Sequence, residues 1–143
     1  MSTILEARGG WWHDYVCPTH GVELDPAHGD SYPCRYGCTL TGEAQAGAWV
    51  VLEHQARARE ARLLARRYRA EGAPADRDRA LAILADFSAY YAEVAAGGAS
   101  ERAEEWMLKG KLFSQALTEA IWGVQIADAA QVLAADPQAR PVL

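Results

Sequence analysis

The pattern of hydrophobic and polar positions changes near Glu43. Before this point Gly, Pro, Asp, Cys and aromatic residues are common, and no hydrophobic period is sustained. After it Ala, Leu, Arg and Glu dominate, and apolar residues recur every three or four positions, the spacing that places side chains on one face of an α-helix. We therefore predict a segment of loops and short strands over residues 1–43 and a helical body over residues 44–143.

The first predicted helix runs from Ala44 to Ala70 and ends at Gly72, two residues before Pro74. Glycine commonly ends helices, and a proline just beyond cannot continue them. Arginines and glutamates fill most of the positions between the apolar ones, which is typical of an amphipathic surface helix. The apolar face expected to pack against the rest of the fold consists of Trp49, Leu52, Ala56, Leu63 and Ala70.

Two further helices are predicted, the second capped by Asp76 and ended by Gly97, the third closed at Asp136 before a proline. Residues 100–111 form the connection between them. Because helices joined by short connections usually pack as antiparallel neighbours, we predict an all-α body of antiparallel helical hairpins. The periodic positions are Ala80, Leu84, Phe87, Tyr91 and Val94 in the second helix, and Leu117, Ala120, Ile121, Val124, Ala127 and Gln131 in the third.

Composition narrows the classes of function. The chain has 143 residues, half of them hydrophobic, which suits one modest globular unit or part of a larger one. A net charge of −5 leaves no broad basic surface, so we expect no nucleic-acid partner. No run has the apolar length of a bilayer-spanning helix, and the first residues lack the pattern of a signal peptide. We therefore predict a cytoplasmic protein without a membrane partner.

The three cysteines point to a metal site, because an odd number cannot all pair within one chain. They lie in the sequences CPTH (residues 17–20) and CRYGC (residues 34–38), a spacing typical of a zinc knuckle. Structural zinc takes four tetrahedral ligands, and a complete set leaves no open position for substrate. The predicted ligands of a structural Zn²⁺ are Cys17, His20, Cys34 and Cys38. The alternative is that these are free thiols and a surface histidine.

The order of several motifs resembles a known family. The sequence WWHDYVCPTHG (residues 11–21) is followed by the Cys34 and Cys38 pair, then by GAW (residues 47–49), which leads into a helix that contains His54. Later comes GKLFSQALTEAIW (residues 110–122). Together these resemble the opening region of bacterial heparinase II/III-like polysaccharide lyases, over Trp11 to Leu133. The resemblance implies that the helical hairpins begin an α/α toroid.

The resemblance also implies a reaction, the β-elimination of glycans that contain uronic acid. In this family an Asn, a His and a Tyr deeper in the toroid carry out the chemistry, and this sequence contains no asparagine. We therefore expect no lyase activity from the chain by itself, with no catalytic residue assigned. The implied partners are a uronic-acid-containing polysaccharide or oligosaccharide and the remainder of the toroid.

Four residues are candidates for glycan contact. Gln115, Glu119 and Trp122 are spaced to share one helix face, where a sugar could stack on the indole while polar groups bind its hydroxyls. The resemblance adds His54. The alternative is that Trp122 belongs to the core, Glu119 lies on a solvated face and His54 is a packing residue.

Two hypotheses for the function follow. The first is an N-terminal portion of a lyase, and the second is a stand-alone zinc-knuckle helical module that binds another protein. Three amphipathic helices can cover only part of their apolar surface, so we expect an exposed apolar surface along the last helix, near Leu117, Ile121, Val124 and Val132. Reading the coding frame downstream of Leu143 would distinguish the two hypotheses.

Overall fold

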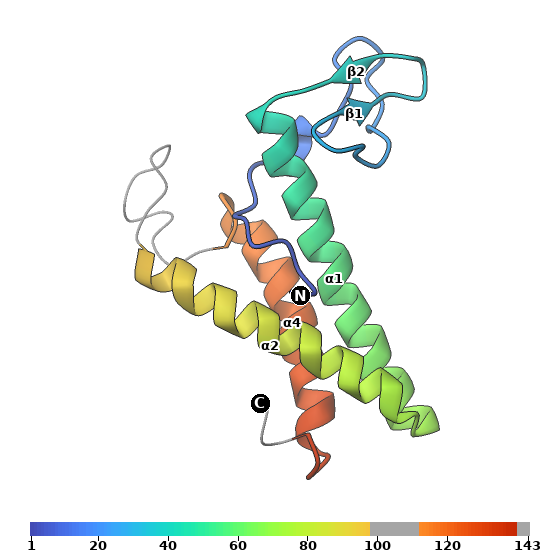
Figure 1. Ribbon diagram of the computed structural model, residues 1–143, viewed down its shortest axis with the longest axis vertical. Coiled ribbons are helices and arrows are strands. Elements are labelled where there is room, and N and C mark those ends of the chain that lie inside the picture. Colours follow the sequence, from blue (N-terminus) through green and yellow to red (C-terminus); the bar gives the residue numbers. More distant parts are fainter. Residues whose placement is uncertain (98–111, 140–143) are drawn as a thin grey trace.

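The structure is a computed structural model, which describes residues 1–97 and 112–139. Within these residues the fold is mostly helical, with a short 3₁₀ helix and a small antiparallel sheet near the N-terminus (Figure 1). The predicted division near Glu43 agrees with the start of the first helix. All-α is too simple a description, because the first segment contains two paired strands. The elements are η1 (Trp12–Asp14), β1 (Tyr32–Pro33), β2 (Thr39–Leu40), α1 (Glu43–Glu71), α2 (Pro74–Gly97) and α4 (Ala116–Ala134).

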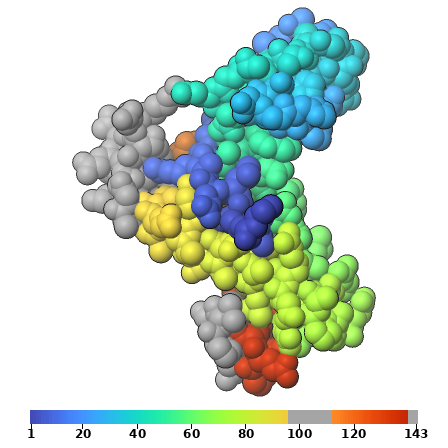
Figure 2. All heavy atoms as spheres, viewed as in Figure 1, coloured from blue at the N-terminus to red at the C-terminus, as the bar shows by residue number. Residues whose placement is uncertain are grey.

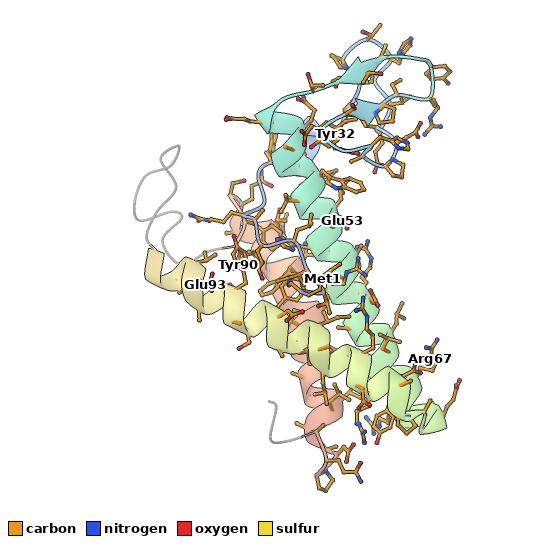
Figure 3. The ribbon with its side chains drawn as sticks, viewed as in Figure 1. Met1, Tyr32, Glu53, Arg67, Tyr90 and Glu93 are labelled. Carbon is orange, nitrogen blue, oxygen red and sulfur yellow. The ribbon has the colours of Figure 1, made fainter. Side chains whose placement is uncertain are left out.

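Helix α1 is the longest element of the described residues, and both the knuckle segment and the other two helices pack against it. The knuckle segment, residues 11–42, forms a lobe at its N-terminal end (Figure 2). Helices α2 and α4 pack on the remainder, with α2 crossing α4 in Figure 1. In Figure 3, Glu53 lies on the part of α1 near the knuckle segment and Arg67 near the other end.

Ion pairs and hydrogen bonds show how the helices run. Arg67 pairs with Asp76 beside the turn, and Arg79 reaches back to Glu60, so α1 and α2 are antiparallel. Helix α4 runs parallel to α1, because residues later in α4 bond to residues later in α1. These partners are Gln55 with Thr118, Arg62 with Asp128, and Tyr68 with Asp136.

The buried face of α1 differs from the predicted one. Leu63 is 67% exposed and Ala70 is exposed, while Trp49, Leu52 and Ala56 are only partly buried. Alanines instead make up most of the buried face, and their small side chains allow the other helices to approach α1 closely. Its members are Ala48, Val51, His54, Gln55, Ala58, Ala61 and Ala65.

The prediction for α2 is confirmed along most of its length, because Ala80, Leu84, Phe87 and Val94 are buried and Tyr91 is partly buried. The predicted cap is wrong. The helix begins at Pro74, and Asp76 lies in its first turn, where the carboxylate pairs with Arg67. Proline suits a first helical position because its fixed φ is already helical and its missing N–H is not needed there.

Helix α4 buries a face other than its predicted stripe. Thr118, Trp122, Ala129 and Leu133 are buried, whereas the six predicted periodic positions are all exposed. Leu117, Ile121 and Val124 are 71%, 49% and 65% exposed. We call these three residues the α4 apolar stripe. The expectation of an exposed apolar surface is confirmed at all three, whereas Val132 is partly buried.

An N-terminal strap, residues 3–10, ties the helices together. Gly9 donates its N–H to the Leu112 carbonyl at 2.9 Å, and Gly10 donates to the Gly47 carbonyl at 2.9 Å. Ser114 binds back to the strap through its N–H and its hydroxyl. At the other end of the strap, the Thr3 N–H donates to the carboxylate of Asp86 on α2.

The predicted connection over residues 100–111 lies outside the described part of the chain. None of the helices within residues 1–97 and 112–139 combines the length and apolar character that crossing a bilayer requires.

We predict that Gly9→Ala destabilises the fold by about 1–3 kcal/mol, the usual cost of overpacking a core. A Cβ at Gly9 would lie 2.5 Å from the Phe113 ring and 2.8 Å from Val51 Cγ2. The matched control is Gly123→Ala in α4, where a Cβ meets nothing within 4 Å and should stabilise the helix by up to about 1 kcal/mol. Urea unfolding of both variants measures the difference, and equal stabilities would contradict the packing at Gly9.

Candidate metal centre

Four side chains of the knuckle segment converge on one point. The donor atoms of Cys17, His20, Cys34 and Cys38 all lie within 4.8 Å of one another. His20 Nδ1 is 3.5 Å from Cys17 Sγ, 3.6 Å from Cys34 Sγ and 3.5 Å from Cys38 Sγ. The sequence-predicted ligands are therefore brought together as a group that could hold a metal ion.

Two tight turns present the ligands. In the first, Gly21 donates its N–H to the Cys17 carbonyl at 2.8 Å. In the second, Gly37 donates to the Cys34 carbonyl at 2.9 Å, and Cys34 donates to the Cys38 carbonyl at 2.7 Å. Both glycines have positive φ, 62° at Gly21 and 93° at Gly37, a conformation that glycine adopts without steric cost. The glycines thus explain how such short segments can aim paired donors inward.

A small aromatic core supports the cluster and joins it to α1. Tyr15 and Tyr32 are buried with their rings 5.8 Å apart, and Tyr15 also packs 5.6 Å from the Trp49 ring. The Tyr15 hydroxyl donates to the Asp25 carbonyl at 2.7 Å. Burial, followed by the nearby Tyr32, raises the pKa of Tyr15 to about 12. The hydroxyl therefore keeps its proton and the hydrogen bond throughout the physiological pH range.

This aromatic support was not among the features predicted from the sequence, although the sequence contains a signal for it. Each cysteine motif is preceded by a tyrosine two residues before its first cysteine: Tyr15 before Cys17, and Tyr32 before Cys34. In an extended chain this spacing places tyrosine and cysteine on the same side. The repeated spacing therefore indicates two similar short segments that face each other, with their aromatic rings in contact behind the thiols.

The electrostatics of the cluster favour a thiolate at Cys17. Burial raises the pKa of this thiol, but hydrogen bonds from the His20 side chain and from the backbone of His20 and Thr19 outweigh burial and lower it to about 6. Burial and the neighbouring Cys17 and Cys34 raise the pKa of Cys38. Thiolates are the form that binds metals, and a bound cation deprotonates a coordinating thiol. The arrangement thus suits a cation better than three neutral thiols.

Exposure is uneven across the cluster. Cys17 and Cys34 are buried, Cys38 is partly buried and His20 is exposed, with its ring 4.9 Å from that of Tyr36. The Tyr36 N–H donates a hydrogen bond to Cys34 Sγ, with N and Sγ 3.4 Å apart, and such a bond stabilises a thiolate. The site lies close enough to the surface for a metal to enter, and its deeper side is anchored in the aromatic core.

The glycan-contact candidates lie outside the core of the knuckle segment, and one of them, Trp122, belongs to the core of the helical body. His54 is 0% exposed, its Nε2–H donates to the Ala7 carbonyl at 2.7 Å, and its ring lies between those of Phe87 and Phe113. Trp122 is 7% exposed and stacks on Tyr91 with the rings 5.6 Å apart. Both occupy packing positions in this arrangement.

The other two candidates flank the start of α4. The Glu119 carboxylate accepts the N–H groups of Leu112 and Phe113 at 2.9–3.2 Å, which fixes the segment before the helix. Gln115 is the N-cap residue, and its Oε1 accepts a 3.4 Å hydrogen bond from Thr118 Oγ1. Glycan contact by these four residues stays a prediction.

Comparisons with known proteins add no family: no protein family model matches the chain, and no curated protein or solved structure matches it.

We predict that buried His54 makes the fold less stable as pH falls below about 6.5. Burial lowers the pKa of His54 below its ordinary value, and its Nδ1 has no hydrogen-bond partner among the described residues. Below the unfolded pKa of about 6.5 the unfolded chain gains a proton that the folded chain does not. Stability is therefore present above that pH and falls by up to about 1.4 kcal/mol per pH unit below it, until the folded pKa is reached.

The measurement is urea unfolding between pH 5.0 and 7.5 for the native protein, His54→Gln and the control His28→Gln. His28 is exposed, so its replacement should reproduce the native pH dependence. His54→Gln should flatten the curve between pH 5.5 and 6.5, above the range in which carboxylates protonate. Identical slopes for all three proteins would show that His54 is not held neutral in the folded state.

Proposed function

We propose that the chain is the N-terminal portion of a heparinase II/III-like polysaccharide lyase, in which a structural zinc knuckle anchors the first hairpins of an α/α toroid. The observation that carries the proposal is the four-ligand cluster seated directly on the start of a long helix. The family itself rests on the resemblance over Trp11 to Leu133. In this role the chain supplies part of the scaffold around a glycan site and lacks the chemistry of elimination.

Zinc is the metal that this set of residues favours, because two closely spaced pairs of Cys and His residues are typical of structural zinc sites. The distances from the histidine to the three sulfur atoms are compatible with zinc. A tetrahedron with Zn–S of about 2.3 Å and Zn–N of about 2.0 Å has S-to-N edges of about 3.5 Å. The three distances from His20 Nδ1 to sulfur are 3.5 Å, 3.6 Å and 3.5 Å.

The role we assign to the metal is structural. Four protein ligands complete a tetrahedron, and catalytic zinc sites instead keep one position open for water or substrate. The knuckle segment contains only two short strands and one turn of 3₁₀ helix, so little regular structure holds it together. Metal binding can supply about 10 kcal/mol of folding free energy to such small units.

The α4 apolar stripe supports the toroid part of the proposal. Leu117, Ile121 and Val124 project from one face of α4 and remain largely exposed. In repeating helical folds each hairpin covers the apolar face of the one before it. A succeeding hairpin packed on α4 would bury Leu117 and Val124, the two more exposed members, and we propose the remainder of the toroid as that partner.

The proposed substrate of the whole lyase is a glycan that contains uronic acid. Elimination requires a group that stabilises the uronate carboxylate, a base and an acid. The sequence has no asparagine for the first role, and His54 is buried in a packing position. We therefore assign no catalytic residue to this chain.

A stand-alone zinc-knuckle module that binds another protein is the second candidate. One observation favours it: the described helices share a continuous aromatic core built from Phe87, Phe113 and Trp122, closed by the N-terminal strap. Such a core is expected of a unit that folds without further hairpins. In this case the α4 apolar stripe would be the surface that binds the partner protein.

We predict about one zinc per chain and a selective loss of metal binding in His20→Ala. Removal of one ligand leaves three thiolates and an open position, so affinity should fall by at least tenfold, measured by competition with a chromophoric chelator. His28→Ala is the matched control, because His28 lies in the same segment and outside the cluster. Protein purified without chelator that contains no metal and three freely titrating thiols would rule out the zinc site.

We predict that the chain alone forms no unsaturated uronate from heparin, heparan, alginate or hyaluronan, measured as growth of the enone absorbance. Activity should appear only with the segment that completes the toroid, which we expect the downstream coding frame or a neighbouring gene to supply, with an Asn-containing motif and a later His and Tyr. A gene neighbourhood without such a segment would favour the stand-alone module. Activity of the chain alone that Gln115→Ala abolishes would overturn the scaffold role.

A further inference from the structure

A hollow of about 440 Å³ lies where the knuckle segment meets the helices. We call it the junction hollow. Val51 and Thr118, which are both buried, contribute to its floor. The side chains that give it its chemistry are Trp12, Glu23, Glu53, Gln55, Arg59 and Ile121, which come from η1, the knuckle segment, α1 and α4.

Trp12 provides an aromatic wall. It is 45% exposed, although large aromatic side chains are usually buried, and its ring packs 3.7 Å from the ring of His13. No residue of η1 is buried, so the core does not require an indole at this position. Ile121 of the α4 apolar stripe also lines the hollow, from α4. An exposed indole beside an apolar side chain suits a ligand with one flat apolar face.

Polar groups surround this apolar surface. Glu23 and Glu53 offer carboxylate acceptors, and Arg59 offers guanidinium donors that have no partner among the described residues. Gln55 is held in place because its Nε2 donates to the Thr118 carbonyl at 3.1 Å. Ligand pockets of 300–1,000 Å³ commonly combine an apolar lining with a few such groups, so the hollow has the size and the composition of a small-molecule site.

We propose that the junction hollow binds one pyranose unit of a glycan, and that it prefers a neutral or amino-bearing ring to a uronate. A pyranose offers an apolar C–H face to the indole and a rim of hydroxyls to the carboxylates and the guanidinium. The choice of a sugar among ligands of this shape rests on the proposed function. The preference for a ring without a carboxylate rests on the hollow alone.

Charge is the basis of that preference. Two carboxylates and one guanidinium line the hollow, so an anionic ring meets a net negative surface. Arg57, which is 3.8 Å from Glu53, is also paired with Glu60 and so offsets the charge of Glu53 only in part. Like-charge contacts of this kind disfavour a ligand even where its shape fits. The hollow would then hold a hexose or hexosamine of the polymer and leave the uronate for the rest of the toroid.

The experiment compares two trisaccharides on the full 143-residue zinc-loaded chain by titration calorimetry. Chitotriose carries neutral N-acetylhexosamine rings, and trigalacturonate carries a carboxylate on each ring. Saturable binding of chitotriose, at least fivefold tighter than that of trigalacturonate, is the expected result. Glu23→Gln with Glu53→Gln should narrow this difference, because the double variant removes both negative charges.

Trp12→Ala and Trp11→Ala form the matched pair. Both indoles are nearly equally exposed, at 45% and 46%, and both contact His13, but only Trp12 lines the hollow. Trp12→Ala should weaken chitotriose binding by roughly tenfold, the scale of one aromatic contact and its buried area, while Trp11→Ala changes it by less than twofold. Circular dichroism and zinc content confirm that both variants are folded.

Three outcomes overturn the proposal: no saturable binding of chitotriose, an equal loss in both tryptophan variants, or tighter binding of trigalacturonate. These outcomes are separable from failure of the proposed function. An active lyase assembled with its completing segment would keep the proposed function even if chitotriose did not bind. Sugar binding by a chain whose gene neighbourhood lacks that segment would keep the site and remove the lyase.

Discussion

Close packing on the small side chains of α1 is the constraint on which the rest of the structure depends. Ala58, Ala61 and Ala65 are 0% exposed, and they face α2 and α4 over the lower part of the helix. Because these side chains are small, α2 and α4 can both pack closely against α1. Ion pairs such as that of Arg62 with Asp128 can then form at the edge of the helix contact. Guanidinium contacts, first from Arg66, lower the pKa of Asp128 to about 2. The carboxylate therefore stays ionised, and able to pair with both arginines, at pH values at which an ordinary aspartate would already be protonated.

The same helix joins two cores of different character. Near its start, Ala48 belongs to the cluster that surrounds Tyr15 and the thiols, and one turn later Val51 belongs to the core of the helical body. Most of the large buried apolar side chains among the described residues belong to the core of the helical body. The knuckle segment has a few aromatic rings and the ligand cluster, so a metal would supply there the cohesion that apolar burial supplies elsewhere. The two parts are thus stabilised by different means along one continuous helix.

The sequence was sufficient to predict features that rest on a few chemically distinctive residues. The clustering of Cys17, His20, Cys34 and Cys38, their glycine turns and the start of α1 follow from motif spacing. The buried face of α2 follows from large apolar residues such as Phe87. The buried face of α1 could not be predicted in this way, because alanine differs little in hydrophobicity from many of its neighbours. The exposed Leu63 was therefore assigned to the buried face by mistake. Asp76 looked like a cap, but a tertiary partner, Arg67, determined its role. The burial of His54 depends on the strap and on Phe113, contacts too distant in sequence for a local pattern to reveal.

The junction hollow shows how the metal centre can matter beyond the knuckle segment. Glu23 is held in a bridge to Val16, directly before Cys17, and the N–H of Cys17 donates to the Val22 carbonyl at 2.8 Å. A cation that fixes Cys17 therefore also fixes the backbone that presents Glu23. Trp12 is tied to the same unit, since its carbonyl accepts the N–H of Tyr15. With a metal bound, one wall of the hollow would thus depend on its coordination, and the wall formed by α1 and α4 depends on the packing of these helices. Ligand binding in the hollow would therefore depend on both parts of the fold, although none of the four residues of the donor cluster lines the hollow.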